Sequence, residues 1–176
     1  MTAHLGKRRD DRRAANRARQ LGLTAVVASH PISGEAAPAG DWLAGSLLQR
    51  CARRGTSDDG LCLIWGGETT VTLGEASAGL GGRCQELALA AAGALRGAAA
   101  GIALLAAGTD GRDGPTDAAG AIVDGRTWQT IESSGREPAR DLAEHNSYPA
   151  LQTAGALLRT GLTGTNVMDL VIGCCL

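Results

Sequence analysis

The stretch AAGTDGRDGPTDAAGAIVDG, residues 106–125, is the part of the sequence that says most about the fold. It begins at the end of an apolar run, residues 102–107, that predicts a buried strand. Glycine and aspartate then dominate until the short run AIVD, residues 121–124. An apolar strand that stops at a glycine-rich polar turn is typical of α/β proteins, in which ligands bind beyond the carboxyl ends of strands. We therefore expect a ligand site here.

Strands and helices alternate on both sides of this stretch. Buried or half-buried strands are expected at residues 23–28, 61–65, 102–107, 156–161 and 169–175, with a strand-like alternation at 68–74. Helices are expected at residues 8–21, 34–54 and 83–95, the last rich in alanine and leucine. This alternation predicts an α/β fold with helices packed on a mixed sheet.

The composition excludes several classes of protein. The chain has 176 residues, of which 26 are glycine, and these follow no triplet period, which excludes a collagen-like chain. With 44% hydrophobic residues and a net charge of −1, the chain is not expected to be wholly disordered or to bind nucleic acid. No apolar stretch reaches the roughly 18 residues of a membrane span, so no membrane partner is expected.

The five cysteines are interpreted as reduced thiols of a cytoplasmic protein. Their number is odd, and no C-x-x-C pair occurs. The three histidines lie far from any cysteine pair in the sequence, so a metal cluster of these residues is not expected.

Four glycine-rich turns share one design, in which an apolar run ends and a polar turn begins. They occupy residues 64–69, 79–86, 106–117 and 160–169. Glycine at such a turn allows backbone N–H groups to approach an anion closely, although it also simply permits tight turns. The turn GLGGRC fails as a dinucleotide fingerprint because Cys84 stands where the third glycine is needed.

Two residues in these turns are candidates for chemistry. Arg83 lies in the first turn of a predicted helix, where the guanidinium and the helix N-terminus both favour an anion. The alternative is a structural arginine paired with Glu86 or Glu68. Asp110 follows a strand directly, so it is a candidate general base or Mg²⁺ ligand.

The remaining polar residues of the same stretch have a simpler interpretation. Asp113 and Thr116 fit residues that cap turns and a helix beginning after Pro115. Thr163, Gly164, Thr165 and Asn166 resemble a cradle for phosphate or substrate, although no P-loop lysine follows them.

Together, the strings GGETTVTLG, GLGGRCQELALA, GTDGRDGPTDAAGA and TGLTGTNVMDL resemble the MOFRL domain. This domain is the C-terminal part of the bacterial-type glycerate 2-kinases, which are also labelled hydroxypyruvate reductases. The resemblance covers residues 61–176 and implies a MOFRL domain there. Residues 1–60 resemble the helix–strand–helix end of the preceding Rossmann-like domain, so the chain is expected to be the C-terminal portion of such an enzyme.

The resemblance implies ATP-dependent phosphorylation of D-glycerate to 2-phosphoglycerate, with Mg²⁺. Carried over by position, Arg83 binds the glycerate carboxylate or the transferred phosphoryl group. Asp110 accepts the hydroxyl proton or helps to hold Mg²⁺. Glu68, Thr165 and Asn166 orient the substrate or metal-bound water.

The family's phosphate-contacting lysine lies in the first domain, and the only lysine of this chain is Lys7. We therefore expect little or no kinase activity from the chain alone, unless the N-terminal domain or another subunit completes the cleft. A non-catalytic truncated remnant is one alternative. A hydroxypyruvate reductase is the other, and the failed fingerprint at Cys84 weighs against it.

Overall fold

The computed structural model describes residues 3–54, 59–74 and 79–176, with side chains from residue 10 onward. Lys7 therefore has no described side chain, and most of the polar break at 55–60 lies outside the described residues. None of the described helices is long and apolar enough to cross a membrane.

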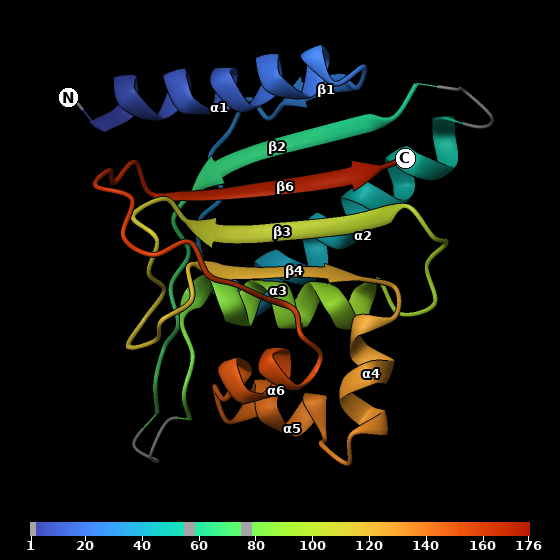
Figure 1. Cartoon of the computed structure of the whole chain (residues 1–176), viewed down its shortest axis with the longest axis vertical. Coiled ribbons are helices and arrows are strands. Elements are labelled where there is room, and N and C mark those ends of the chain that lie inside the picture. Colours follow the sequence, from blue (N-terminus) through green and yellow to red (C-terminus); the bar gives the residue numbers. More distant parts are fainter. Residues whose placement is uncertain (1–2, 55–58, 75–78) are drawn as a thin grey trace.

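A six-stranded mixed sheet forms the centre of the molecule, as predicted (Figure 1). Its order is β1-β2-β6-β3-β4-β5. The β1–β2 pair is parallel, and each of the other neighbouring pairs is antiparallel. The strands are β1 (Thr24–Val27), β2 (Leu61–Gly67), β3 (Ile102–Gly108), β4 (Gly120–Asp124), β5 (Leu157–Leu158) and β6 (Asp169–Cys175).

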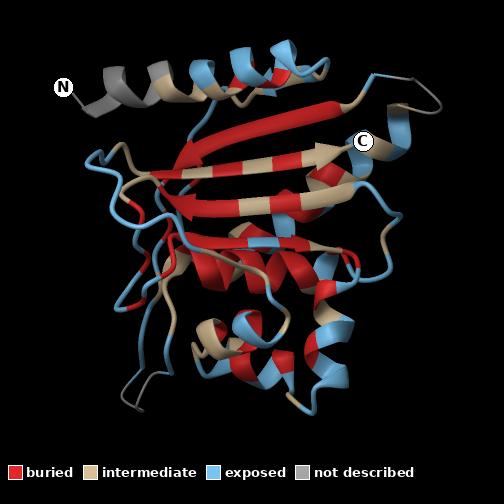
Figure 2. Ribbon diagram, in the orientation of Figure 1, coloured by how far each residue is buried: buried red, intermediate tan, exposed pale blue. Residues whose placement is uncertain are grey.

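Helices cover the two faces of this sheet unequally. The helix α1 (Ala3–Gln20) packs on one face through a small cluster that includes Ala15, Ala18, Cys62 and Ile64. The main core lies on the other face, under α2 (Ala36–Arg54) and α3 (Arg83–Ala94). Three short helices extend this layer beside α3: α4 (Thr127–Ser133), α5 (Pro138–Ala143) and α6 (Ser147–Thr153). Figure 2 shows that α3 and the central strands are the most buried elements.

The sequence of α3 explains its place at the centre. Nine of its residues, Cys84 to Ala92, are buried, and most of them are alanine or leucine, which favour a helix and leave no polar group unpaired. Close contact with α2 depends on Gly40, because a Cβ atom there would lie 2.2 Å from the carbonyl oxygen of Leu87. A glycine at this position therefore lets the two helix backbones approach each other.

Two local expectations are wrong. Residues 68–74 form no strand, because Thr70 and Thr72 instead hydrogen-bond to Glu35, with only isolated bridges at Gly67 and Thr70. No helix follows Pro115, and the chain turns directly into β4.

Candidate active site

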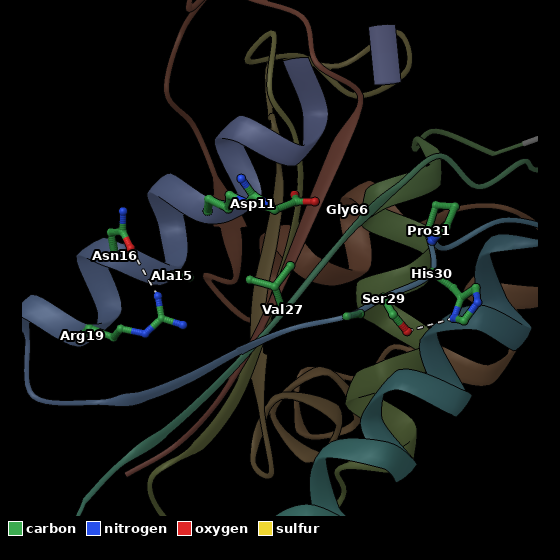
Figure 3. Close-up of a pocket in the computed structure, with 11 residues that line it drawn as sticks. Asp11, Ala15, Asn16, Arg19, Val27, Ser29, His30, Pro31 and Gly66 are labelled. Atoms are coloured by element: carbon green, nitrogen blue, oxygen red, sulfur yellow. Dashed lines mark hydrogen bonds between the residues drawn. The ribbon is translucent and has the colours of Figure 1, made fainter. Parts of the chain in front are cut away.

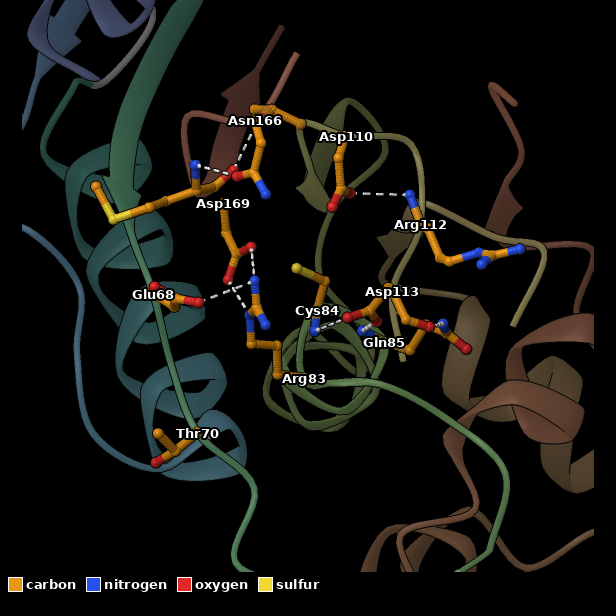
Figure 4. A network of polar contacts seen from close by, with 12 residues as sticks. Glu68, Thr70, Arg83, Cys84, Gln85, Asp110, Arg112, Asp113, Asn166 and Asp169 are labelled. Carbon is orange, nitrogen blue, oxygen red and sulfur yellow. Dashed lines mark hydrogen bonds and ion pairs between the residues drawn. The ribbon is translucent and has the colours of Figure 1, made fainter. Parts of the chain in front are cut away.

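The ends of three central strands meet at one edge of the sheet. In the sheet register, Gly67 of β2 and Gly108 of β3 both lie opposite Asp169, the first residue of β6. Because β2 and β3 both run antiparallel to β6, their carboxyl ends lie at the same edge of the sheet, one on each side of Asp169. Glu68 and Asp110 follow those ends, so the structure brings these predicted residues to a common edge (Figure 4).

Arg83 reaches this edge from the first turn of α3 and is held there by carboxylates. Its Nε donates to Asp169 Oδ2 at 2.7 Å, and its Nη2 donates to Asp169 Oδ1 at 2.8 Å. A longer ion pair of 3.3 Å joins Nη2 to Glu68 Oε1. The hydrogen bonds to Asp169 raise the pKa of Arg83 above its ordinary value. The alternative pairing with Glu86 is wrong, because Glu86 contacts His145 Nδ1 at 2.8 Å.

Asp169 is the residue of this candidate site that the sequence did not predict. Its side chain is only 2% exposed, whereas that of Arg83 is 37% exposed. A bidentate pair of this kind fixes the plane of the guanidinium as well as its position. The sequence offered one signal, an acidic residue at the start of an otherwise apolar strand.

Asp113 caps α3 from a distant loop. Its two carboxylate oxygens accept hydrogen bonds from the backbone N–H groups of Cys84, at 3.1 Å, and Gln85, at 2.8 Å. The Gln85 side chain donates in return to the Asp113 carbonyl and to the Thr116 hydroxyl. Gly82 is required at this contact, since a Cβ atom there would lie 2.3 Å from Asp113 Cγ. Asp113 therefore caps the helix that carries Arg83, not a helix after Pro115.

Burial raises the pKa of Asp113 to about 6 from 3.8, against the opposing effect of the two N–H donors. The folded state thus binds this proton more tightly than the unfolded chain does. The resulting stability is fully present below pH 3.8 and is lost as the pH rises through about 6.

We expect the free energy of unfolding of the unsubstituted chain, relative to Asp113→Asn, to fall by on the order of 2 kcal/mol between about pH 4 and pH 7. Urea titrations at several pH values measure this difference. Asp124→Asn is the control. Burial raises the pKa of Asp124, but N–H and hydroxyl donors from Arg126 and Thr127 bring it below its ordinary value. Its contribution is therefore lost as the pH falls, and a shared trend for both variants would contradict the prediction.

Hydrogen bonds connect the end of β3, around Asp110, to the loop before β6. Asp110 Oδ1 accepts the N–H of Arg112 at 3.1 Å, and the Asp110 carbonyl accepts the N–H of Thr163 at 3.1 Å. The hydroxyl of Thr109 donates to the Met168 carbonyl at 2.7 Å. These bonds bring the predicted phosphate cradle against the end of β3.

Thr165 and Asn166 lie on the exposed rim of this edge. The side-chain oxygen of Asn166 accepts the N–H of Met168 at 3.2 Å. Both residues are exposed to solvent.

The acidic residues fit Mg²⁺ only as an ion that arrives with a phosphate ligand. Among the described residues, no three or more His, Cys, Asp or Glu side chains are grouped to hold a metal ion. Mg²⁺ commonly takes one or two carboxylates and fills its remaining positions with water and substrate phosphate. Asp110, half-buried at the end of β3, is the residue of this chain that suits that role.

The fold is an α/β domain with a candidate ligand site at the carboxyl edge of a mixed sheet, where carboxylates orient one arginine. The chain belongs to the MOFRL family, whose sequence profile matches residues 61–169. It is 46% identical over 160 residues to a D-glycerate 2-kinase of Thermotoga maritima, and 45% identical over 159 residues to a glycerate 2-kinase of Pyrococcus horikoshii.

These matches cover 91% and 90% of the chain but only 38% and 35% of the two relatives. The crystal structure of a glycerate kinase from Thermotoga maritima superimposes with a TM-score of 0.88 and 44% identity. That superposition covers 94% of this chain and 39% of the other. The chain thus spans less than half the length of the relatives that it matches.

Proposed function

We propose that this chain provides one side of a glycerate-phosphorylating site, with Arg83 as its anion-binding group. In the described part of the chain, the bonds from Arg83 to Asp169 and Glu68 use Nε and Nη2. Nη1 is therefore the guanidinium nitrogen left to bind an added anion. The observation that carries the proposal is that carboxylates hold the Arg83 guanidinium in place through Nε and Nη2, which leaves Nη1 for a ligand.

The ligand that suits this position is a small hydroxy acid or its phosphate ester. A carboxylate or phosphoryl oxygen can accept a hydrogen bond from Nη1, while Asp169 holds the guanidinium still. Asp110 lies at the same edge and can accept the proton of a hydroxyl group that attacks a phosphoryl donor. Glu68, Thr165 and Asn166 are the residues proposed to orient the ligand.

ATP and Mg²⁺ are part of the proposal, and holding the ion is the alternative role for Asp110 to that of proton acceptor. When bound, Mg²⁺ neutralises the charge that develops on the transferred phosphoryl group. Domain limits of 1–60 and 61–176 are proposed as well. The site is proposed to need residues from outside this chain for turnover, because the relatives named glycerate kinases are more than twice as long.

Titration calorimetry with 2-phosphoglycerate tests the assignment. We expect Arg83→Ala to weaken binding by about tenfold or more, since a charge-assisted hydrogen bond is lost. Arg159→Ala is the matched control, because Arg159 pairs with Asp117 at 2.9 Å on the exposed surface. Equal affinities for the two variants, or no binding by the unsubstituted chain, would contradict the assignment.

A coupled assay for glycerate-dependent ADP release tests whether the chain is active alone. Turnover is expected to be undetectable, and robust turnover would overturn that part of the proposal. Quenching of nicotinamide fluorescence would instead favour a hydroxypyruvate reductase.

A further inference from the structure

The strand β1 forms an open edge of the sheet. In the described residues it pairs only with β2, through bonds that include Thr24 N–H to Gly60 O at 2.7 Å and Ala28 N–H to Ile64 O at 2.8 Å. Backbone groups alternate in direction along a strand. Those of Ala25 and Val27 therefore point outward, away from β2.

One of these outward backbone groups already has a hydrogen-bond partner. Arg19 Nη2 donates to the carbonyl oxygen of Ala25 at 3.1 Å. The N–H and carbonyl of Val27 lie further along the same edge, where the chain continues to Ser29 and His30. This short segment therefore offers an outward donor and acceptor to another extended chain.

Two hollows flank this open edge, one on each face of the sheet. The first has a volume of about 860 Å³ and lies between α1 and the end of β1, where Arg12, Arg19 and His30 line it together with Asp11 (Figure 3). The second has a volume of about 760 Å³ and lies toward α2. The two hollows lie on opposite faces of the sheet. Val27, which lines the first hollow, packs in the cluster under α1, whereas Trp65, which lines the second, packs in the main core under α2.

The two hollows differ in chemistry. Arginine side chains give the α1 hollow a net positive lining. The α2 hollow is bordered by Val26, Pro38, Trp42 and Trp65, with Glu35 and Arg50 as its charged residues. Trp42 is 61% exposed and Val26 is 37% exposed, so apolar side chains lie uncovered beside the strand edge. Contiguous exposed apolar side chains are common at interaction sites.

We infer that an extended polypeptide segment from outside residues 1–176 adds to β1 as a further strand. Successive side chains of a strand point to opposite faces, so such a segment would fill both hollows at once. Its acidic side chains would face Arg12 and Arg19, and its apolar side chains would face Val26 and Trp42. The relatives have more than half of their length outside the matched region, which provides a source for the segment.

A second copy of this chain fits the edge less well. Pairing of β1 with itself would present only Thr24, Ala25, Val26 and Val27, none of which carries a carboxylate for the arginine side. A nucleotide in the α1 hollow would leave Trp42 uncovered. An acidic and apolar strand accounts for both hollows and for the open backbone groups.

The probe is a set of overlapping peptides that span the part of the Thermotoga maritima D-glycerate 2-kinase outside the matched region. Each is titrated against the full 176-residue chain, and hydrogen exchange is followed at residues 25–29. We expect one peptide with alternating acidic and apolar residues to bind and to protect these amides. Val27→Pro removes the outward N–H but leaves the bonds to β2, and it is expected to weaken binding by about tenfold or more.

Val27→Thr is the matched control, because it keeps the N–H and a branched side chain, and it is expected to bind normally. Arg12→Glu, on the surface of α1, gives a second measurement that does not depend on the strand and should also weaken binding. Arg83→Ala should have no effect, which separates this inference from the proposed function. Binding by no peptide, or equal binding by the two Val27 variants, would overturn the inference. So would protection of the same amides by Mg·ATP or by self-association of the chain.

Discussion

Replacing Gly40 with alanine is expected to destabilise the chain, although alanine ordinarily favours a helix over glycine. The added Cβ atom would lie 2.2 Å from the carbonyl oxygen of Leu87 and 3.1 Å from Ala90 Cβ. The first of these contacts is with backbone, which cannot rotate away. The helices α2 and α3 must separate to admit the methyl group, and overpacking of this kind costs about 1–3 kcal/mol.

Gly45 in the same helix provides the matched control. A Cβ atom there meets nothing within 4 Å. Gly45→Ala should therefore stabilise the chain by about 0.5–1 kcal/mol through reduced backbone entropy in the unfolded state. Urea denaturation measures both variants, and a shift of the two stabilities in the same direction would refute the packing argument.

Replacing Asp169 with asparagine is expected to have the largest effect in the site. The variant leaves the Arg83 guanidinium partly buried without its bidentate partner and turns an amide N–H₂ toward it. Breaking a buried pair commonly costs several kcal/mol, and partial exposure of Arg83 brings the expected loss to about 2 kcal/mol. Because the guanidinium plane is no longer fixed, affinity for 2-phosphoglycerate should fall as well.

Glu68→Gln is the control for Asp169→Asn, because it also removes a carboxylate partner of Arg83 but at an exposed position. Glu68 also pairs with Arg83, but at 3.3 Å and with its side chain 52% exposed. Its removal should change the free energy of unfolding by less than about 1 kcal/mol, because exposed pairs are screened by solvent. Denaturation of both variants at low and high salt measures the contrast. A loss of stability for Glu68→Gln as large as that for Asp169→Asn would contradict it.

Local patterns in the sequence predicted most of the sheet and the long helices. The run at 83–95 predicted α3 to within one residue, because its alanine and leucine residues favour a helix and its apolar residues recur at helical spacing. The expectation at 68–74 failed because alternation there reflects bonds from Thr70 and Thr72 to Glu35. Those partners lie more than 30 residues away, and periodicity holds no information about them.

The site shows the same limit. Arg83 and Asp110 were predicted because each follows a recognisable local signal, a helix start or a strand end. The bond between Arg83 and Asp169 spans 86 residues and depends on the register of β6 between its neighbours. Local patterns predict that Asp113 caps a turn or helix close to it in the sequence. Its target in the structure, the first turn of α3, lies 28 residues earlier, where a local pattern cannot indicate it. Such pairings follow from tertiary topology, which local patterns do not specify.

The position of β6 has a consequence for the order of folding. This strand is synthesised after the other five, yet it joins β1–β2 on one side to β3–β4–β5 on the other. Before residues 169–175 pair, β2 and β3 each lack a neighbour on the inner side of the sheet. Contacts of such long sequence separation slow folding and expose strand edges to aggregation. Closure of the sheet is therefore expected to be a late step in folding, and the same step brings Asp169 to Arg83.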